Sequence, residues 1–262
     1  MMIERFFINF GKKVITFFYF FGGLSKLAGQ TLYWTFVPPY KKERIFEQAR
    51  KAGHDSLPIV SMIGLFIGMI MALQTAILMQ RLGSEMYIAS IVALSLVREL
   101  GPVITALVVA GRVGASITAE IGSMQVTEQI DALEAFATNP IKYLVVPRFL
   151  ALTLMLPILT LYSNILGIFG GYAICVYRLG ISSSMYIKVT TDALLYKDLF
   201  TGLIKTVFFG MIIAFVSCYE GFNVEGGAEG VGNATRQAVV ASFILIITAD
   251  CIFTAFFYFI FP

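Results

Sequence analysis

Arg98 and Glu99 lie side by side within a long apolar stretch of the chain, residues 88–111. A charged side chain at the centre of a membrane helix costs about 2.5–3.5 kcal/mol on insertion scales, so such residues usually have partners and a role. Pro102 follows closely, and a proline leaves the carbonyl four residues before it, here that of Arg98, without its helical donor. This combination predicts a polar site within the membrane that holds or moves the helices.

Arg98 and Glu99 need partners on other helices, because neighbours along a helix point about 100° apart. The candidate partners are Lys205 in the fourth apolar stretch and Asp250 in the fifth, and the four residues together are neutral. We predict that they form an intramembrane charge network. The first hypothesis pairs Arg98 with Asp250, and the alternative pairs Glu99 with Lys205. Lys205 lies nearer one membrane surface, toward which a lysine is able to snorkel.

The sequence shows no arrangement for catalysis. The single histidine, His54, stands in a polar linker, where a solvated side chain is the usual state. Cys175, Cys218 and Cys251 have apolar neighbours and no paired spacing, which argues against disulfides or a zinc site. We expect no catalytic residue, no metal ion and no cofactor in this chain. A lipid-modifying enzyme would need a nucleophile, an acid–base pair or a metal cluster at one membrane depth.

Composition predicts an integral membrane protein. Of the 262 residues, 58% are hydrophobic and 13% are charged, which is about half the charged fraction of a soluble domain. The expected fold is an all-α polytopic membrane protein with five transmembrane helices at residues 58–80, 88–111, 144–177, 199–219 and 238–261. The third stretch is too long for one upright span, so we expect a single tilted or bent helix, with Pro157 and the glycines 167, 170 and 171 as bending points.

The basic residues predict an orientation. Residues 1–57 hold nine Lys and Arg, and Arg112, Lys142, Arg148 and Arg236 raise the number on that side to thirteen. The opposite side holds four, which are Arg81, Arg178, Lys188 and Lys197. By the positive-inside tendency, the N-terminus is cytoplasmic and the C-terminus lies outside.

The N-terminal segment, residues 1–57, mixes many phenylalanines with lysines and precedes the membrane domain, residues 58–262. This composition is typical of helices that lie in the headgroup region. The alternative is a sixth span at residues 14–37, which Lys26 and Gln30 disfavour.

A short cytoplasmic helix is predicted at residues 127–136. Thr127 is suited to cap it, Glu128 and Asp131 lie in its first turn, and Asn139-Pro140 ends it. Ile130, Leu133 and Phe136 then form an apolar stripe at three-residue spacing. The stripe either packs on the protein's own bundle or docks on a soluble partner, and the pattern leaves both open.

The first span carries Gly64 and Gly68 at four-residue spacing, which is typical of close helix packing. Methionine and leucine residues surround them, and such an adaptable apolar wall suits acyl chains. Ordinary packing and lipid-facing surface are the alternative for any single residue of this span.

Several segments together resemble the permease subunit of lipid ABC transporters of the MlaE family, which work with MCE-domain proteins. The matching segments are 96–107, beginning Leu-Val-Arg-Glu-Leu-Gly-Pro, then 110–115, 119–124 and 127–134, followed by Pro140-Ile141 and 146–148. The resemblance runs from about residue 50 to the C-terminus.

The resemblance implies a bacterial inner-membrane homodimer that moves phospholipid, with each copy engaging a cytoplasmic ATPase that binds ATP and Mg²⁺. It implies an MCE-domain lipid-binding partner and a lipid pocket between the two copies. The implied ATPase-coupling residues are Thr127, Glu128, Ile130, Asp131, Leu133, Glu134 and Phe136. The implied pocket residues are Gly64, Leu65, Gly68, Met69, Leu73, Leu78, Tyr87 and Leu100.

Two further points bear on function. The glycine-rich stretch 221–232 is expected to be a linker in the second cytoplasmic loop and not a nucleotide site, because the sequence holds no phosphate-binding Gly-x-x-x-x-Gly-Lys-Ser/Thr motif.

An ATPase-independent secondary transporter or channel would also use intramembrane charges, and it remains the alternative function. We expect no nucleic-acid partner.

Overall fold

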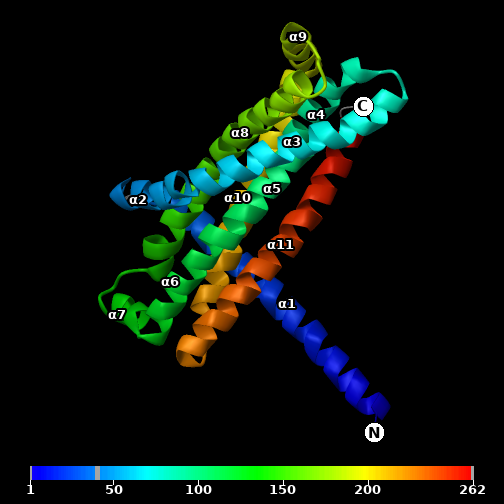
Figure 1. Cartoon of the computed structure of the whole chain (residues 1–262). Helices are drawn as coiled ribbons and strands as arrows, with labels where there is room; N and C mark the ends of the chain where they lie inside the picture. Colours follow the sequence, from blue (N-terminus) through cyan, green and yellow to red (C-terminus); the bar gives the residue numbers. More distant parts are fainter. Residues whose placement is uncertain (1, 39–41, 261–262) are drawn as a thin grey trace.

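The computed structural model describes residues 2–38 and 42–260, and throughout these ranges the regular structure is helical (Figure 1). Five helical stretches are long and apolar enough to cross a membrane: Lys42–Arg81, Glu85–Val126, Ile141–Tyr177, Tyr196–Phe222 and Gly227–Phe259. They contain the five predicted spans, apart from residues 260 and 261 of the last. The protein is therefore an all-α polytopic membrane protein.

Two helices precede the first span. α1 (Met2–Thr35) is one helix of 34 residues, and α2 (Lys42–Ala52) follows it. A short 3₁₀ turn, η1 (His54–Ser56), then leads into α3 (Leu57–Arg81), the first span. α1 is not among the five membrane-length apolar stretches, which disfavours the alternative of a sixth span.

The second span is longer than predicted. It begins with η2 (Glu85–Tyr87) and runs without a break through α4 (Ile88–Ser95), η3 (Leu96–Leu100), α5 (Gly101–Val109), η4 (Ala110–Gly114) and α6 (Ala115–Val126). Beyond residue 111, the predicted end of the span, the helix continues to Val126.

The remaining elements are α7 (Gln129–Ala135), η5 (Ile141–Val145), α8 (Val146–Tyr177), α9 (Ser183–Ala193), α10 (Tyr196–Phe222) and α11 (Gly227–Ile260). The third span is a single helix with Pro157 inside it, as predicted. The expected glycine-rich linker is largely helical, because only residues 223–226 separate α10 from α11.

Three five-residue segments of the spans, η3, η4 and η5, are π-helical. Two of them end two residues before a proline: η3 before Pro102 and η5 before Pro147. A proline has no N–H to donate, and the preceding residue instead donates to the carbonyl five residues back, Gly101 to Leu96 and Val146 to Ile141. The prolines thus explain two of the three widened turns.

Three spans contact α8, which packs against α3 and α10 and also meets α5 and the preceding helix α2, whereas α11 packs on α10, α6 and α5. α3 and α8 approach closely because small residues line their contact. A side chain on Gly64 would collide with Ser163, and one on Gly68 would collide with the backbone of Gly167. Without such small residues the two backbones could not come this close.

The bundle has two ends that the chain visits alternately (Figure 1). The α7 end carries α7 and the turn between α10 and α11, and α2 joins α3 on this side. The α9 end carries α9 and the turn between α3 and α4.

We predict that Gly68→Ala destabilises the protein by about 1–3 kcal/mol, as overpacking of a tight interior does. The added methyl group would lie 2.7 Å from the Cα of Gly167, and backbone cannot rotate away as a side chain can. The thermal midpoint of the purified protein in detergent measures the effect. Gly232→Ala, where nothing lies within 4 Å of the new methyl group, is the matched control. Equal midpoints for the two variants would contradict the close packing of α3 on α8.

Candidate functional site

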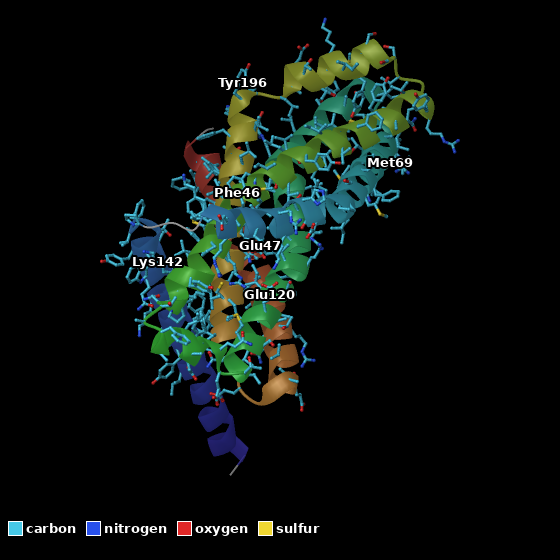
Figure 2. The ribbon with its side chains drawn as sticks, turned by 90° about the vertical axis from the view of Figure 1, so that its left-hand side faces the viewer. Phe46, Glu47, Met69, Glu120, Lys142 and Tyr196 are labelled. Carbon is cyan, nitrogen blue, oxygen red and sulfur yellow. The ribbon has the colours of Figure 1, made fainter. Side chains whose placement is uncertain are left out.

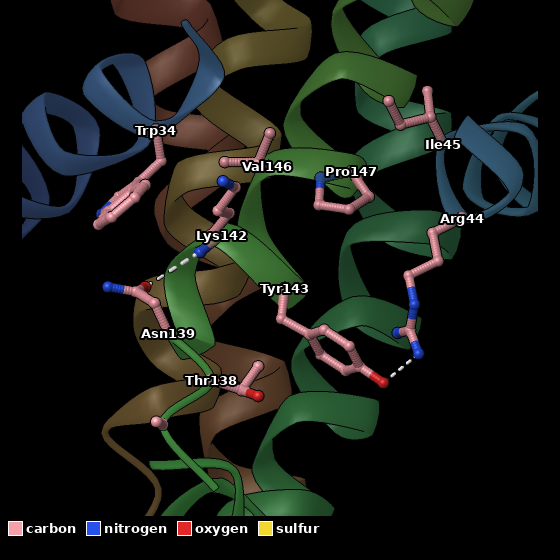
Figure 3. Close-up of a pocket in the computed structure, with 10 residues that line it drawn as sticks. Trp34, Arg44, Ile45, Thr138, Asn139, Lys142, Tyr143, Val146 and Pro147 are labelled. Carbon is pink, nitrogen blue, oxygen red and sulfur yellow. Dashed lines mark hydrogen bonds between the residues drawn. The ribbon is translucent and has the colours of Figure 1, made fainter. Parts of the chain in front are cut away.

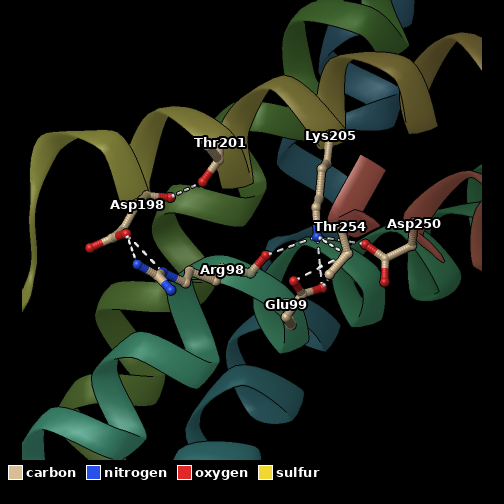
Figure 4. Close-up of polar contacts among 7 residues, drawn as sticks. All are labelled: Arg98, Glu99, Asp198, Thr201, Lys205, Asp250 and Thr254. Carbon is tan, nitrogen blue, oxygen red and sulfur yellow. Dashed lines mark hydrogen bonds and ion pairs between the residues drawn. The ribbon is translucent and has the colours of Figure 1, made fainter. Parts of the chain in front are cut away.

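A network of ion pairs joins the second, fourth and fifth spans near the α9 end (Figure 4). Its first pair links Arg98 in η3 to Asp198 in the first turn of α10. Nε of Arg98 donates to Oδ1 of Asp198 at 2.7 Å, and Nη2 contacts the same oxygen. The other oxygen of Asp198 accepts the N–H of Leu195, which caps α10. Asp198 is only 2% exposed, so it needs both donors.

Lys205 is the centre of the second part of the network. Its side chain is 2% exposed, and Nζ lies 2.7 Å from Oε2 of Glu99 and 3.0 Å from Oδ1 of Asp250. Nζ also donates to the hydroxyl of Thr254 at 2.7 Å and to the carbonyl of Arg98 at 3.3 Å. That carbonyl is the one that Pro102 deprives of its helical donor. One ammonium group thus donates to a backbone carbonyl and forms ion pairs with two carboxylates, and these partners come from two other spans.

These pairings correct two sequence-based expectations. The first hypothesis, an Arg98–Asp250 pair, was wrong, because Arg98 pairs with Asp198 and Asp250 pairs with Lys205. The alternative Glu99–Lys205 pair is confirmed. Lys205 does not snorkel to the surface, since it is buried among its partners.

Asp198 and Thr254 were missed by sequence reasoning. Asp198 lies just outside the predicted fourth span, which began at residue 199. Its capping position in the first turn of a helix was the available signal. Thr254 carries no charge and gave no signal, although its hydroxyl also donates to Glu99 at 3.1 Å.

A second network lies nearer the α7 end and joins α2, α6 and α8. Glu120 of α6 accepts from buried Arg148 of α8 at 2.8 Å and from Lys51 of α2 at 3.3 Å. Lys51 also pairs with Glu47, one turn earlier in α2. The network fastens α2 to the bundle, and the sequence alone did not bring these residues together.

The predicted coupling residues fall into two groups. Ile130 is 5% exposed and Leu133 is half-buried, and both pack in the core cluster of the bundle. Phe136 is instead 81% exposed. Of the two alternatives left open for the stripe, Ile130 and Leu133 pack on the protein's own bundle and hold α7 (Gln129–Ala135) against it, whereas Phe136 does not. Thr127, Glu128, Asp131 and Glu134 are exposed, with Glu128 in a left-handed conformation (φ 57°).

The predicted pocket residues also lie on different faces. Gly64 and Gly68 are buried against α8, so they serve helix packing and do not face an open pocket. Leu65, Met69 and Leu100 are half-buried. Leu73, Leu78 and Tyr87 are exposed.

An exposed apolar stripe runs along α3 opposite the glycines, which we call the α3 stripe. Its members recur at intervals of three or four residues: Ile59, Met62, Phe66, Ile70, Leu73 and Ile77. One face of α3 is thus small and packed, whereas the other is large and uncovered in the single chain.

Within residues 2–38 and 42–260, no group of three or more His, Cys, Asp or Glu side chains is placed to hold a metal ion. The charged side chains of both networks face one another in ion pairs. Their geometry joins helices, so the fold and site define a polytopic membrane protein whose spans are fastened together by ion pairs.

The chain belongs to the MlaE permease family, whose model, described as permease MlaE, matches residues 45–256. It is 44% identical to a probable ABC transporter permease protein of Rickettsia conorii, over 95% of this chain and 96% of that protein. It is 36% identical to the intermembrane phospholipid transport system permease protein MlaE of Haemophilus influenzae, over 97% and 98% of the two chains. The chloroplast protein TRIGALACTOSYLDIACYLGLYCEROL 1 of Arabidopsis thaliana is 37% identical over 92% of this chain and 69% of its own length. The protein is an ABC transporter permease of this family.

We predict that Lys205→Met lowers the free energy of unfolding by about 3–5 kcal/mol, because it strands Glu99 and Asp250 without their cation. Adding Glu99→Gln and Asp250→Asn removes the stranded charges and recovers much of the loss. The thermal midpoint in detergent measures both effects, and Lys188→Met on exposed α9 is the control. A triple variant no more stable than Lys205→Met would show that the three residues do not act together.

Proposed function

We propose that the protein is the non-catalytic permease subunit of a transporter that moves phospholipid between the bacterial inner membrane and an MCE-type lipid-binding partner. A separate ATPase binds ATP and Mg²⁺ and drives transport. The observation that carries the proposal is the similarity to the Haemophilus influenzae permease, which is named for intermembrane phospholipid transport and matches this chain over nearly its whole length.

The α7 end is proposed to face the cytoplasm. Nine of the nineteen basic residues precede α3, and Arg112, Lys142, Arg148 and Arg236 lie toward the same end. The positive-inside tendency then places the end of α11 outside the cytoplasm. In this orientation α7 lies where an ATPase can reach it.

The ATPase is proposed to dock on the outer face of α7. Ile130 and Leu133 fasten this helix to the bundle, so a force on α7 reaches the spans through them. The outer face offers the ring of Phe136, which is exposed at the end of α7. Exposed aromatic residues are frequent anchors of binding hot spots.

The lipid is proposed to bind between two copies of the chain, along the α3 stripe. The stripe consists of large, exposed apolar side chains that alternate with the packed face of the same helix. Leu73 belongs to the stripe, and exposed Leu78 and Tyr87 lie beyond it toward the α9 end. A second copy would cover this face and leave an apolar chamber for acyl chains between the two helices.

Replacing Phe136 by Asp should prevent copurification of the ATPase, because the change places a charge at the centre of the proposed contact. The permease itself should fold normally, since Phe136 is 81% exposed. Copurification from membranes that contain all subunits measures the effect. Tyr177→Asp changes an equally exposed ring at the far end of α8 and should leave the ATPase bound. An intact complex with Phe136→Asp would exclude this surface as the dock.

Orientation is tested with single cysteines in a Cys251→Ala background, because Cys251 is the exposed native cysteine. In intact spheroplasts, Tyr196→Cys at the α9 end should react with an impermeant thiol reagent, and Lys42→Cys at the start of α2 should not. Permeabilised cells should label both positions, which controls for accessibility. The reverse pattern would invert the proposed orientation, and labelling of both positions in intact cells would contradict an odd number of spans between them.

A further inference from the structure

A cavity of about 370 Å³ lies between the end of α1, the start of α2 and the segment that leads from α7 into α8 (Figure 3). Its lining combines two cations, Arg44 and Lys142, with two aromatic rings, Trp34 and Tyr143. Among the described residues that line it, none is acidic. The cavity shares no lining residue with the α3 stripe or with the charge network at the α9 end.

Both cations are held by neutral groups. Arg44 donates to the hydroxyl of Tyr143, and its guanidinium lies 3.6 Å from the centre of the same ring. Lys142 donates to the carbonyl of Pro38 at 3.1 Å and lies 5.3 Å from the ring centre of Trp34. Within the described ranges neither forms an ion pair with a carboxylate, unlike Lys51, Arg98, Arg148 and Lys205. Two positive charges are therefore fixed beside one cavity without a counter-charge.

The rest of the lining is mixed, because Thr138 and Asn139 are polar and the other residues are apolar. Ile45 and Val146 contribute aliphatic side chains, and Val146 begins α8, within the third membrane-length stretch. Phe46, which follows Ile45, is 76% exposed (Figure 2). An exposed phenylalanine and a tryptophan beside the first turn of a span are typical of the boundary between headgroups and hydrocarbon.

We propose that this cavity binds the headgroup of an anionic phospholipid from the membrane leaflet at the α7 end. Arg44 and Lys142 would bind the phosphate oxygens, because charge-assisted hydrogen bonds to phosphate are the strongest contacts that these side chains make. Ile45 and Val146 would contact the start of the acyl chains. Basic pockets between membrane helices are a recurring form of anionic-lipid site.

The aliphatic side chains of Ile45 and Val146 would contribute to the binding of a lipid but not to the binding of free phosphate. This part of the lining therefore favours a lipid. The backbone N–H groups at the start of η5 are also unavailable to an isolated anion, because the side chain of Asn139 already accepts from Ile141 at 2.9 Å and from Lys142 at 3.1 Å. Recognition therefore depends on the two side-chain charges and on the apolar lining together.

A bound lipid would fill the space between α1, α2 and the segment that carries α7. This role goes beyond transport, because the bound lipid would fasten the membrane surface to the α7 region and would not be the transported molecule. Without the bound lipid, the protein is expected to keep both ion-pair networks and the α3 stripe.

The test uses native mass spectrometry of the full chain in detergent, titrated with phosphatidylglycerol or with phosphatidylethanolamine. The wild-type protein should prefer phosphatidylglycerol. Arg44→Gln with Lys142→Gln should weaken phosphatidylglycerol binding about 30-fold, since each basic residue near anionic lipid contributes about five-fold. If the double variant does not fold, the single Lys142→Gln variant should show the five-fold loss. Arg44→Lys with Lys142→Arg should retain binding.

The matched control is Arg50→Gln with Arg236→Gln, which removes two exposed cations near the same end of the bundle. It should bind phosphatidylglycerol like the wild type. Equal losses of phosphatidylglycerol binding in the two double variants would show that binding depends only on diffuse surface charge, which would overturn the proposed site. Displacement of the lipid by millimolar inorganic phosphate would show a free-anion site and overturn the lipid assignment. Failure of either kind leaves the transport proposal intact, because that proposal depends on other surfaces.

Discussion

The close contact of α3 with α8 is the constraint on which the bundle depends. Lipid is as apolar as the helices, so helices in a membrane gain little from hiding apolar surface and must instead fit together closely. Gly64 and Gly68 on α3 face Ser163 and Gly167 on α8, where larger side chains would collide. This contact uses up the small face of α3 and turns its large residues outward. The surface proposed for lipid and for a second copy is thus a consequence of how the first span packs.

The two ion-pair networks complement that contact, because they join further helices to one another and to α8. Lys205 and Arg98 join the second, fourth and fifth spans near the α9 end, and Glu120 joins α2, α6 and α8 nearer the α7 end. Breaking a buried ion pair is costly, whereas apolar side chains slide over one another more easily. The networks therefore fix the relative heights of the helices, and the apolar contacts between them fix the spacing.

Sequence patterns predicted what depends on neighbours along the chain and missed what depends on neighbours in space. The length of the apolar stretches gave the five spans, and the spacing of Gly64 and Gly68 indicated close packing. The partner of Arg98 could not be predicted, because Asp198 lies 100 residues away at the rim of a span. In α7, Ile130 and Phe136 shared one apolar pattern, yet one is buried and the other exposed. Which member of a stripe faces inward is decided by the surface beneath it.

The π-helical segments change which residues of the second span lie on the same face of the helix. Each such turn accommodates one residue more than an α-turn, and the helix beyond it resumes as if that residue were absent. A helical wheel drawn through residues 88–126 therefore loses phase by about 100° at η3 and again at η4. Faces assigned by counting from Ile88 are wrong for Ile117 or Glu120, although the helix itself is unbroken. To assign a side chain beyond η4 to a face of this span, two residues must first be subtracted from the count that starts at Ile88.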